Sequence, residues 1–247
     1  MELWGITDSG KIRKHNQDFF KMQSSDDKSI AVLVVCDGMG GANAGNVASE
    51  LAAEVFIDNM SRLINDTRRP VDKMKVAEVV TDAVLSANAA VFDKSLQDEE
   101  FAGMGTTLTA AVSTGDGEVV ANIGDSRLYH VTENEITQIT RDHSVVEDMI
   151  ERGEITRSEA RFHPSRNLIT RALGTSFYEP PDIFLLNLKT DDFIILCSDG
   201  LSNVVLDKEM LQELKRGETV RESCEALVDM ALERGAPDNV TAVIFKK

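Results

Sequence analysis

Acidic residues stand at the ends of apolar runs at several points in this chain, where they could bind a metal ion. Asp37 ends the run AVLVVC and Asp199 ends the run FIILCS, and a glycine follows each. Asp125 follows VVANIG, and Asp238 lies just before the run VTAVIF. Carboxylates brought together repel one another, and burial increases the cost. A hard divalent cation such as Mg²⁺ or Mn²⁺ removes both problems, because it prefers oxygen ligands.

The same residues also have an ordinary structural interpretation. Asp-Gly and Asp-Asn after a strand are common turn sequences, so one such pair predicts only a turn. Asp18, in RKHNQDFF, is a fifth acid near an expected strand. If these strand ends meet at one rim of the fold, the carboxylates converge and the glycine after Asp37 lets a backbone carbonyl approach a metal. Spacing alone leaves both interpretations open.

The elements that must position these acids are strands and long helices. Apolar or alternating runs predict strands over 2–7, 30–36, 106–113, 118–123, 127–132, 182–188, 192–197 and 240–245. Helical periodicity predicts helices over 45–64, 71–97 and 218–234. Clustered strands against clustered helices favour an α+β fold with largely antiparallel sheets. The charged stretch 141–171 predicts short helices outside the sheet, as either a solvated insertion or a flap facing the substrate.

Composition narrows the functional classes. The chain has 247 residues, 42% of them apolar, which is enough for a large core in one or two domains. A net charge of −16 argues against a nucleic-acid binder or adsorption to anionic lipid. No run approaches the roughly 20 apolar residues of a membrane span, and no signal peptide is recognisable. Three cysteines, an odd number, favour a reducing compartment, so we expect a cytoplasmic location.

Eight short blocks, taken together, are more specific than any single acid. In chain order they are GKIRKHNQD at 10–18, VCDGMGG at 35–41, MGTTL at 104–108, NIGDSR at 122–127, TRDHS at 140–144, ITRALG at 169–174, CSDGL at 197–201 and DNVT at 238–241. With these blocks the chain resembles the compact bacterial form of the protein phosphatase 2C family, the metal-dependent serine/threonine phosphatases. The resemblance implies a single catalytic domain over 1–247. It also implies a four-layer sandwich of two antiparallel β-sheets flanked on both sides by α-helices, with a flap around 141–171.

The resemblance further implies a centre of two to three Mn²⁺ or Mg²⁺ ions. Asp37 would bridge two of them. Asp199 and Asp238 would complete the shell of one, and Gly38 would offer its carbonyl oxygen to the other. Asp125, together with Asp199, resembles the pair that holds a third, weaker metal in bacterial members.

Other positions concern the substrate and departures from the eukaryotic pattern. Arg13 matches the arginine that binds the substrate phosphate, and a guanidinium suits this because it grips two phosphate oxygens at once. Met39 replaces a histidine of eukaryotic relatives, and Gln17 replaces a glutamate that helps to bind a metal through water in those relatives. Asp18 is therefore expected to take a larger part in binding the metal of the catalytic centre, through waters. His143 is either a general acid or a residue that fixes the base of the flap by hydrogen bonding.

The implied reaction is hydrolysis of phosphoserine and phosphothreonine in proteins by a metal-activated water, opposing a bacterial serine/threonine kinase. The expected partners are phosphorylated proteins, including that kinase and its substrates, with no nucleic acid and no membrane, and the chain is expected to be a monomer. One alternative is a pseudophosphatase that uses the fold for binding. Another is a phosphatase for one dedicated regulatory partner, such as an anti-sigma-factor antagonist. A pseudophosphatase usually lacks a metal aspartate, and all four are present here.

Overall fold

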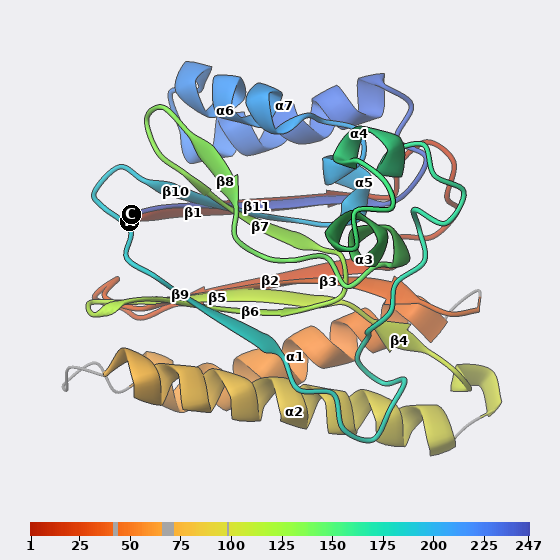
Figure 1. The fold of residues 1–247 in the computed structure, drawn as a ribbon. Coiled ribbons are helices and arrows are strands. Elements are labelled where there is room, and N and C mark those ends of the chain that lie inside the picture. Colours follow the sequence, from red (N-terminus) through yellow and green to blue (C-terminus); the bar gives the residue numbers. More distant parts are fainter. Residues whose placement is uncertain (42–43, 66–71, 98) are drawn as a thin grey trace.

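The computed structural model describes residues 1–41, 44–65, 72–97 and 99–247. Within these residues, two antiparallel β-sheets face each other, and helices cover the outer side of each sheet (Figure 1). The predicted α+β sandwich with helices on both sides is therefore confirmed.

Each sheet combines strands from distant parts of the chain. The first sheet has the strand order β1-β11-β10-β7-β8. Its strands are β1 (Glu2–Asp8), β11 (Val240–Lys246), β10 (Phe193–Cys197), β7 (Arg127–Val131) and β8 (Ile136–Gln138). The second sheet has the order β2-β3-β5-β6-β9, and β4 pairs with β3. Its strands are β2 (Asp18–Ser24), β3 (Ala31–Met39), β4 (Gly105–Thr106), β5 (Leu108–Thr114), β6 (Gly117–Ile123) and β9 (Asp182–Leu186).

The long helices form the outer layers of the sandwich. Helices α1 (Ala44–Asn65) and α2 (Lys73–Gln97) cover the second sheet, and α6 (Asp207–Arg216) and α7 (Val220–Glu233) cover the first (Figure 1). The short helices are α3 (Val145–Glu151), α4 (Arg157–Ala160), α5 (Asp199–Ser202) and a 3₁₀ turn at Glu99–Phe101. None of the helices in the described ranges is long and apolar enough to cross a membrane.

Strand β3 shows why the apolar runs of this sequence are continuous. Val32 and Val34 pack on the side of α1 and α2, whereas Leu33 and Val35 pack between the two sheets. Side chains of a strand alternate between its two faces, so a strand buried on both faces has no polar position until it ends. The first polar residue of β3 is therefore Asp37, at the rim.

The sequence predicted most of these elements. Each predicted strand overlaps an observed strand, and the three predicted helices correspond to α1, α2 and α7. The sequence patterns did not predict β2, β8, α5 or α6. β2 is an edge strand whose positions after Asp18 are only half-buried, so its apolar signal is weak. In α6 only Met210 and Leu214 are buried, so the apolar face is narrow.

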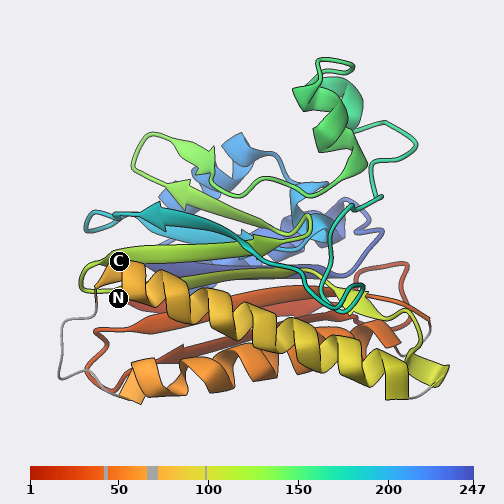
Figure 2. The ribbon, with the colours of Figure 1, turned by 60° about the horizontal axis from the view of Figure 1, so that its bottom comes forward.

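The stretch 141–171 contains the expected short helices. Figure 2 shows α3 and α4, in green, standing out from the sandwich. Ser144 caps α3 by accepting the Glu147 N–H, and Thr156 and Glu159 form a capping box on α4. The two ends of the stretch are joined, because the Val145 N–H donates to the Leu168 carbonyl at 2.9 Å. The Thr170 N–H also donates to the His143 carbonyl at 2.8 Å.

Candidate active site

Strand pairing brings four of the predicted acids to one end of the sandwich. In the β2–β3 register Asp18 lies directly opposite Asp37. In the other sheet, Asp199 follows the end of β10 and Asp238 precedes the start of β11, the strand paired with β10. The two sheets meet at this rim, because the hydroxyls of Ser198 and Thr241 both reach the Asp18 carboxylate.

These carboxylates strongly perturb one another. Burial raises the pKa of Asp18 to about 7, and repulsion from Asp199 and Asp238 adds to the rise, against hydrogen bonds from two hydroxyls. Burial, reinforced by Asp238, raises the pKa of Asp199 to about 6. Burial together with Asp18 and Asp199 raises the pKa of Asp37 well above its usual range. The cluster thus carries more negative charge than the surrounding protein neutralises, as expected for a cation site.

Asp18 provides a specific test of whether a metal fits. Its Oδ2 accepts hydrogen bonds from Ser198 Oγ and Thr241 Oγ1, both at 2.7 Å. Its Oδ1 is buried and has no hydrogen-bond partner among the described residues. A buried carboxylate oxygen without a donor is costly, and a metal ion or a water on that ion would satisfy it. The residues present therefore fit a hard divalent cation.

Side chains alone do not complete such a site. In the described part of the chain, no three carboxylate, imidazole or thiolate groups come close enough to form a cage by themselves. Mg²⁺ and Mn²⁺ sites commonly include backbone carbonyls and several waters, so a sparse cluster of aspartates is compatible with them.

The backbone at Asp37 and Gly38 is fixed by neighbouring strands. The Asp37 N–H donates to Thr107 Oγ1 at 2.9 Å, and the Asp37 carbonyl accepts the Thr107 N–H at 2.8 Å and the Thr106 hydroxyl at 3.0 Å. Gly38 leaves no room for a side chain, since a Cβ there would lie 2.0 Å from the Gly45 carbonyl oxygen. The two threonines are therefore structural residues that hold Asp37 in place.

Arg13 lies at the same rim, on the loop between β1 and β2. Its Nη2 is 2.8 Å from Asp238 Oδ2, and its side chain is 53% exposed. The hydrogen bond and charge of Asp238 raise the pKa of Arg13, with smaller contributions from Asp37 and Asp199. The guanidinium is thus beside the acidic cluster and accessible to a ligand.

Asp125 belongs to the same electrostatic cluster but comes from the turn between β6 and β7. Burial raises its pKa well above the usual range, and repulsion from Asp199 adds to the rise. His143 holds this turn, because its Nδ1 accepts the Gly124 N–H at 3.1 Å and its backbone N–H donates to the Gly124 carbonyl at 2.9 Å. The side chain is 4% exposed, burial lowers its pKa, and its contacts with Gly124 support this turn at the base of 141–171.

Comparison with known proteins identifies the family. The family model for protein phosphatase 2C matches residues 11–243. The chain belongs to the protein phosphatase 2C family. The resemblance drawn from the eight blocks is confirmed, and with it the prediction of a phosphoprotein phosphatase.

Individual members of the protein phosphatase 2C family agree over the whole chain. The serine/threonine phosphatase stp of Listeria innocua is 35% identical over 245 residues, which cover 98% of this chain and 94% of that protein. The serine/threonine protein phosphatase PstP of Mycobacterium tuberculosis is 37% identical over 238 residues, covering 96% of this chain and 43% of PstP. Stp1 of Staphylococcus aureus superposes with a TM-score of 0.90 at 32% identity, covering 100% of this chain and 94% of the other.

A second solved structure bears on the metal. The catalytic domain of PstP in complex with two manganese ions superposes with a TM-score of 0.83 at 35% identity, covering 98% of this chain and 96% of that one. Manganese is therefore bound by a protein phosphatase 2C of nearly the same fold.

Several residues at this protein phosphatase 2C site were not predicted from the sequence. They are Ser198 and Thr241 on Asp18, Asn239, and the ion pair of Arg127 with Asp142. All of them lie inside the blocks CSDGL, DNVT, NIGDSR and TRDHS. These four blocks are thus the sequence signal that could have found the missed residues. Within them, the sequence predicted a role in metal binding for the acids alone.

Asn239 fastens the loop that carries Arg13. Its Nδ2 donates to the Ser9 carbonyl at 2.9 Å and the His15 carbonyl at 3.0 Å, and its Oδ1 accepts the Gln17 N–H at 2.8 Å. The residue is 4% exposed, so these bonds have little competition from water.

Asn239→Ala is expected to destabilise the fold, because it leaves buried backbone groups unpaired. A cost of about 1–3 kcal/mol is expected, which lowers the melting temperature by about 2–12 °C in a chain of this size. Thermal unfolding in chelator measures the change. The control is Asn59→Ala, since Asn59 makes an exposed bond within α1. Equal melting temperatures for the two variants would contradict the assignment.

Proposed function

We propose that this protein phosphatase 2C hydrolyses phosphoserine and phosphothreonine in proteins with bound Mn²⁺ or Mg²⁺. The observation that carries the proposal is the convergence of buried carboxylates that raise one another's pKa, with Asp18 Oδ1 buried and unpaired among the described residues. The manganese complex of PstP, at 35% identity, supports the choice of metal.

We assign the metal ligands as follows. Asp37 would bridge two ions, Gly38 would offer its carbonyl to one, and Asp199 and Asp238 would complete the shell of the other. Asp125 with Asp199 would hold a third ion, for a total of two to three. The mutual repulsion of these carboxylates supports the assignment, because each is stabilised when a cation is shared.

The metal ions, when bound, supply Lewis acidity and an activated water. The residues of this chain then have separate tasks. Arg13 would bind two equatorial oxygens of the phosphoryl group and stabilise the charge that develops on them. Asp18 would orient water at the centre through its unpaired Oδ1. Asp238 would position Arg13 through the 2.8 Å ion pair.

The wider context is also part of the proposal. The whole of 1–247 would form one catalytic domain, and 141–171 would act as a flap that borders the site and selects protein substrates. The enzyme would be a cytoplasmic monomer that opposes a serine/threonine kinase and acts on that kinase and its substrates. Its similarity to bacterial serine/threonine phosphatases supports this context.

The first experiment measures hydrolysis of a phosphothreonine peptide with Mn²⁺, with Mg²⁺ and with chelator. Turnover is expected only with metal, and Asp199→Ala is expected to reduce it by at least about 10²-fold, the typical effect of losing one charge-stabilising group. A well-folded protein that shows no turnover at any metal concentration would instead favour the pseudophosphatase interpretation.

A further inference from the structure

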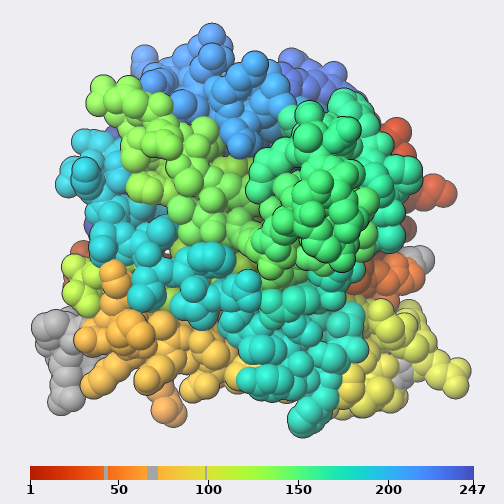
Figure 3. All heavy atoms as spheres, viewed as in Figure 1, coloured from red at the N-terminus to blue at the C-terminus, as the bar shows by residue number. Residues whose placement is uncertain are grey.

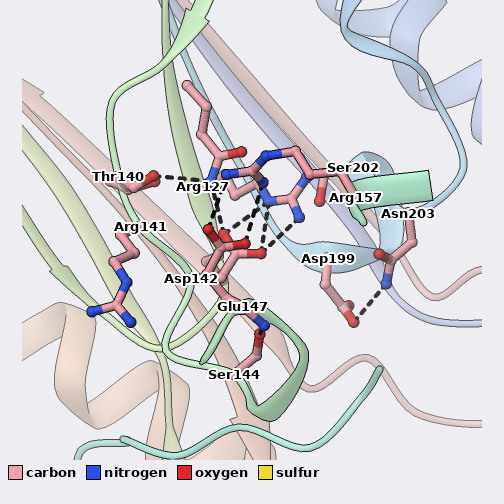
Figure 4. A network of polar contacts seen from close by, with 12 residues as sticks. Arg127, Thr140, Arg141, Asp142, Ser144, Glu147, Arg157, Asp199, Ser202 and Asn203 are labelled. Atoms are coloured by element: carbon pink, nitrogen blue, oxygen red, sulfur yellow. Dashed lines mark hydrogen bonds and ion pairs between the residues drawn. The ribbon is translucent and has the colours of Figure 1, made fainter. Parts of the chain in front are cut away.

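A cavity of about 500 Å³ adjoins the proposed metal centre. Asp125 and Asp199 line one side of it, and 141–171 and α6 line the others. In the space-filling view the green stretch 141–171 lies beside the blue region that Figure 1 labels α6 (Figure 3). Asn203, which also lines the cavity, donates to Asp199 Oδ2 at 3.0 Å (Figure 4). The cavity is therefore continuous with the wall of the active site.

Most of the charges that line this cavity are already neutralised. Arg127 holds Asp142 with contacts of 2.6–3.1 Å, and Arg157 holds the buried Glu147 at 2.9 Å (Figure 4). In the proposed function, Asp125 and Asp199 are engaged with metal. These assignments account for every lining carboxylate except Asp207.

Three lining cations remain without a carboxylate partner among the described residues. They are Arg161, Arg166 and Lys208. All three are exposed, and Arg161 makes only a long hydrogen bond of 3.4 Å to the Ser202 carbonyl. With Asp125 and Asp199 engaged by metal, as in the proposed function, these three cations outnumber the one remaining lining carboxylate, Asp207, and attract anionic groups to the cavity.

We propose that this cavity is a subsite for an anionic side chain that neighbours the phosphorylated residue of the substrate. The inference rests on the proposed function and extends it to a substrate class: phosphoproteins with an aspartate, a glutamate or a second phosphorylated residue beside the target. Arg161 and Lys208 are the specificity-determining residues, from α4's C-terminal end and α6 respectively. The apolar side chains of Val146, Ile150 and Leu206 line the same cavity and can contact the substrate's aliphatic parts.

The test compares phosphothreonine peptides that differ only beside the phosphothreonine. Their flanks are acidic, neutral, basic or carry a second phosphothreonine. Both anionic peptides are expected to exceed the neutral peptide by up to about tenfold in kcat/KM at low salt, since each exposed ion pair contributes modestly and more than one cation lines the cavity. The preference is expected to shrink at high salt, because the cations are exposed. The ratio of the acidic to the doubly phosphorylated peptide shows which source is preferred.

Charge reversal locates the preference. In Lys208→Glu and in Arg161→Glu, the ratio of acidic to basic peptide is expected to fall at least about fivefold, and in the double variant it is expected to invert. The control is Lys189→Glu, which makes the same change in net charge but whose side chain lines a different cavity. Each ratio is taken within one variant, so differences in overall activity cancel.

Binding distinguishes this inference from the proposed function. Fluorescence anisotropy with labelled peptides gives Kd without turnover. Equal Kd for acidic and neutral peptides would overturn the subsite, whether or not hydrolysis occurs. An equal loss of preference in Lys189→Glu would also overturn it, because overall charge would then explain the effect. Anion-selective binding without hydrolysis would support the subsite while rejecting the proposed reaction.

Discussion

Asp37→Asn is expected to lower metal-dependent kcat/KM by about 10³-fold or more while making the metal-free protein more stable. Asp37 is the proposed bridging ligand. Removing a single neutral hydrogen-bond donor from a reacting centre typically lowers kcat by about 10²–10³-fold, and removing a charged metal ligand is expected to lower it at least as much. The amide keeps the shape of the side chain but removes a charge that Asp18 and Asp199 repel. Relief of this repulsion is expected to raise the melting temperature of the metal-free protein.

The variant is expected to lose activity and gain stability, and this combination is specific to a residue that serves a functional site. Turnover with Mn²⁺ and thermal unfolding in chelator at pH 8 are measured on the same preparation. Asp229→Asn is the matched control, because Asp229 is an exposed residue of α7. A variant that loses both activity and stability would mean that Asp37 serves the fold rather than a metal.

The metal-free protein is expected to lose stability as the pH rises from about 4 to about 7. The pKa of Asp18 is raised to about 7 and that of Asp199 to about 6, whereas both groups would titrate near 3.8 in the unfolded chain. Between these values the folded state binds more protons than the unfolded state, so the free energy of unfolding falls with increasing pH. The contribution of the two protonated carboxyl groups to the free energy of unfolding is complete below about pH 4 and lost above about pH 7. Its size is on the order of a few kcal/mol.

Bound Mn²⁺ is expected to reverse this slope, because metal competes with protons for the same oxygens. Urea unfolding between pH 4.5 and 8, with chelator and with Mn²⁺, gives both curves. Asp18→Asn is expected to remove part of the slope in chelator, whereas Asp229→Asn is expected to leave it unchanged. A flat curve in chelator would show that the carboxylates are not forced together in solution.

Local sequence signals predicted the elements that have strong patterns. β3 and β10 are buried on both faces, so their apolar runs end sharply at the acids of the rim. α1 and α2 repeat their apolar residues over many turns. β2 and α6 lie at an edge or bury few side chains, and their patterns are correspondingly weak. The strength of each prediction therefore followed the extent of burial.

The sequence by itself determined which acids stand at strand ends and, through the ordered blocks, the family to which the chain belongs. Only the tertiary structure decided how these acids meet. The β2–β3 register sets Asp18 against Asp37, and hydroxyls 180 and 223 residues away in the chain hold Asp18. Asn239 likewise fastens a loop more than 220 residues distant. Such contacts depend on which strands pair and in what register, and the periodicity of a single segment carries no information about its partner.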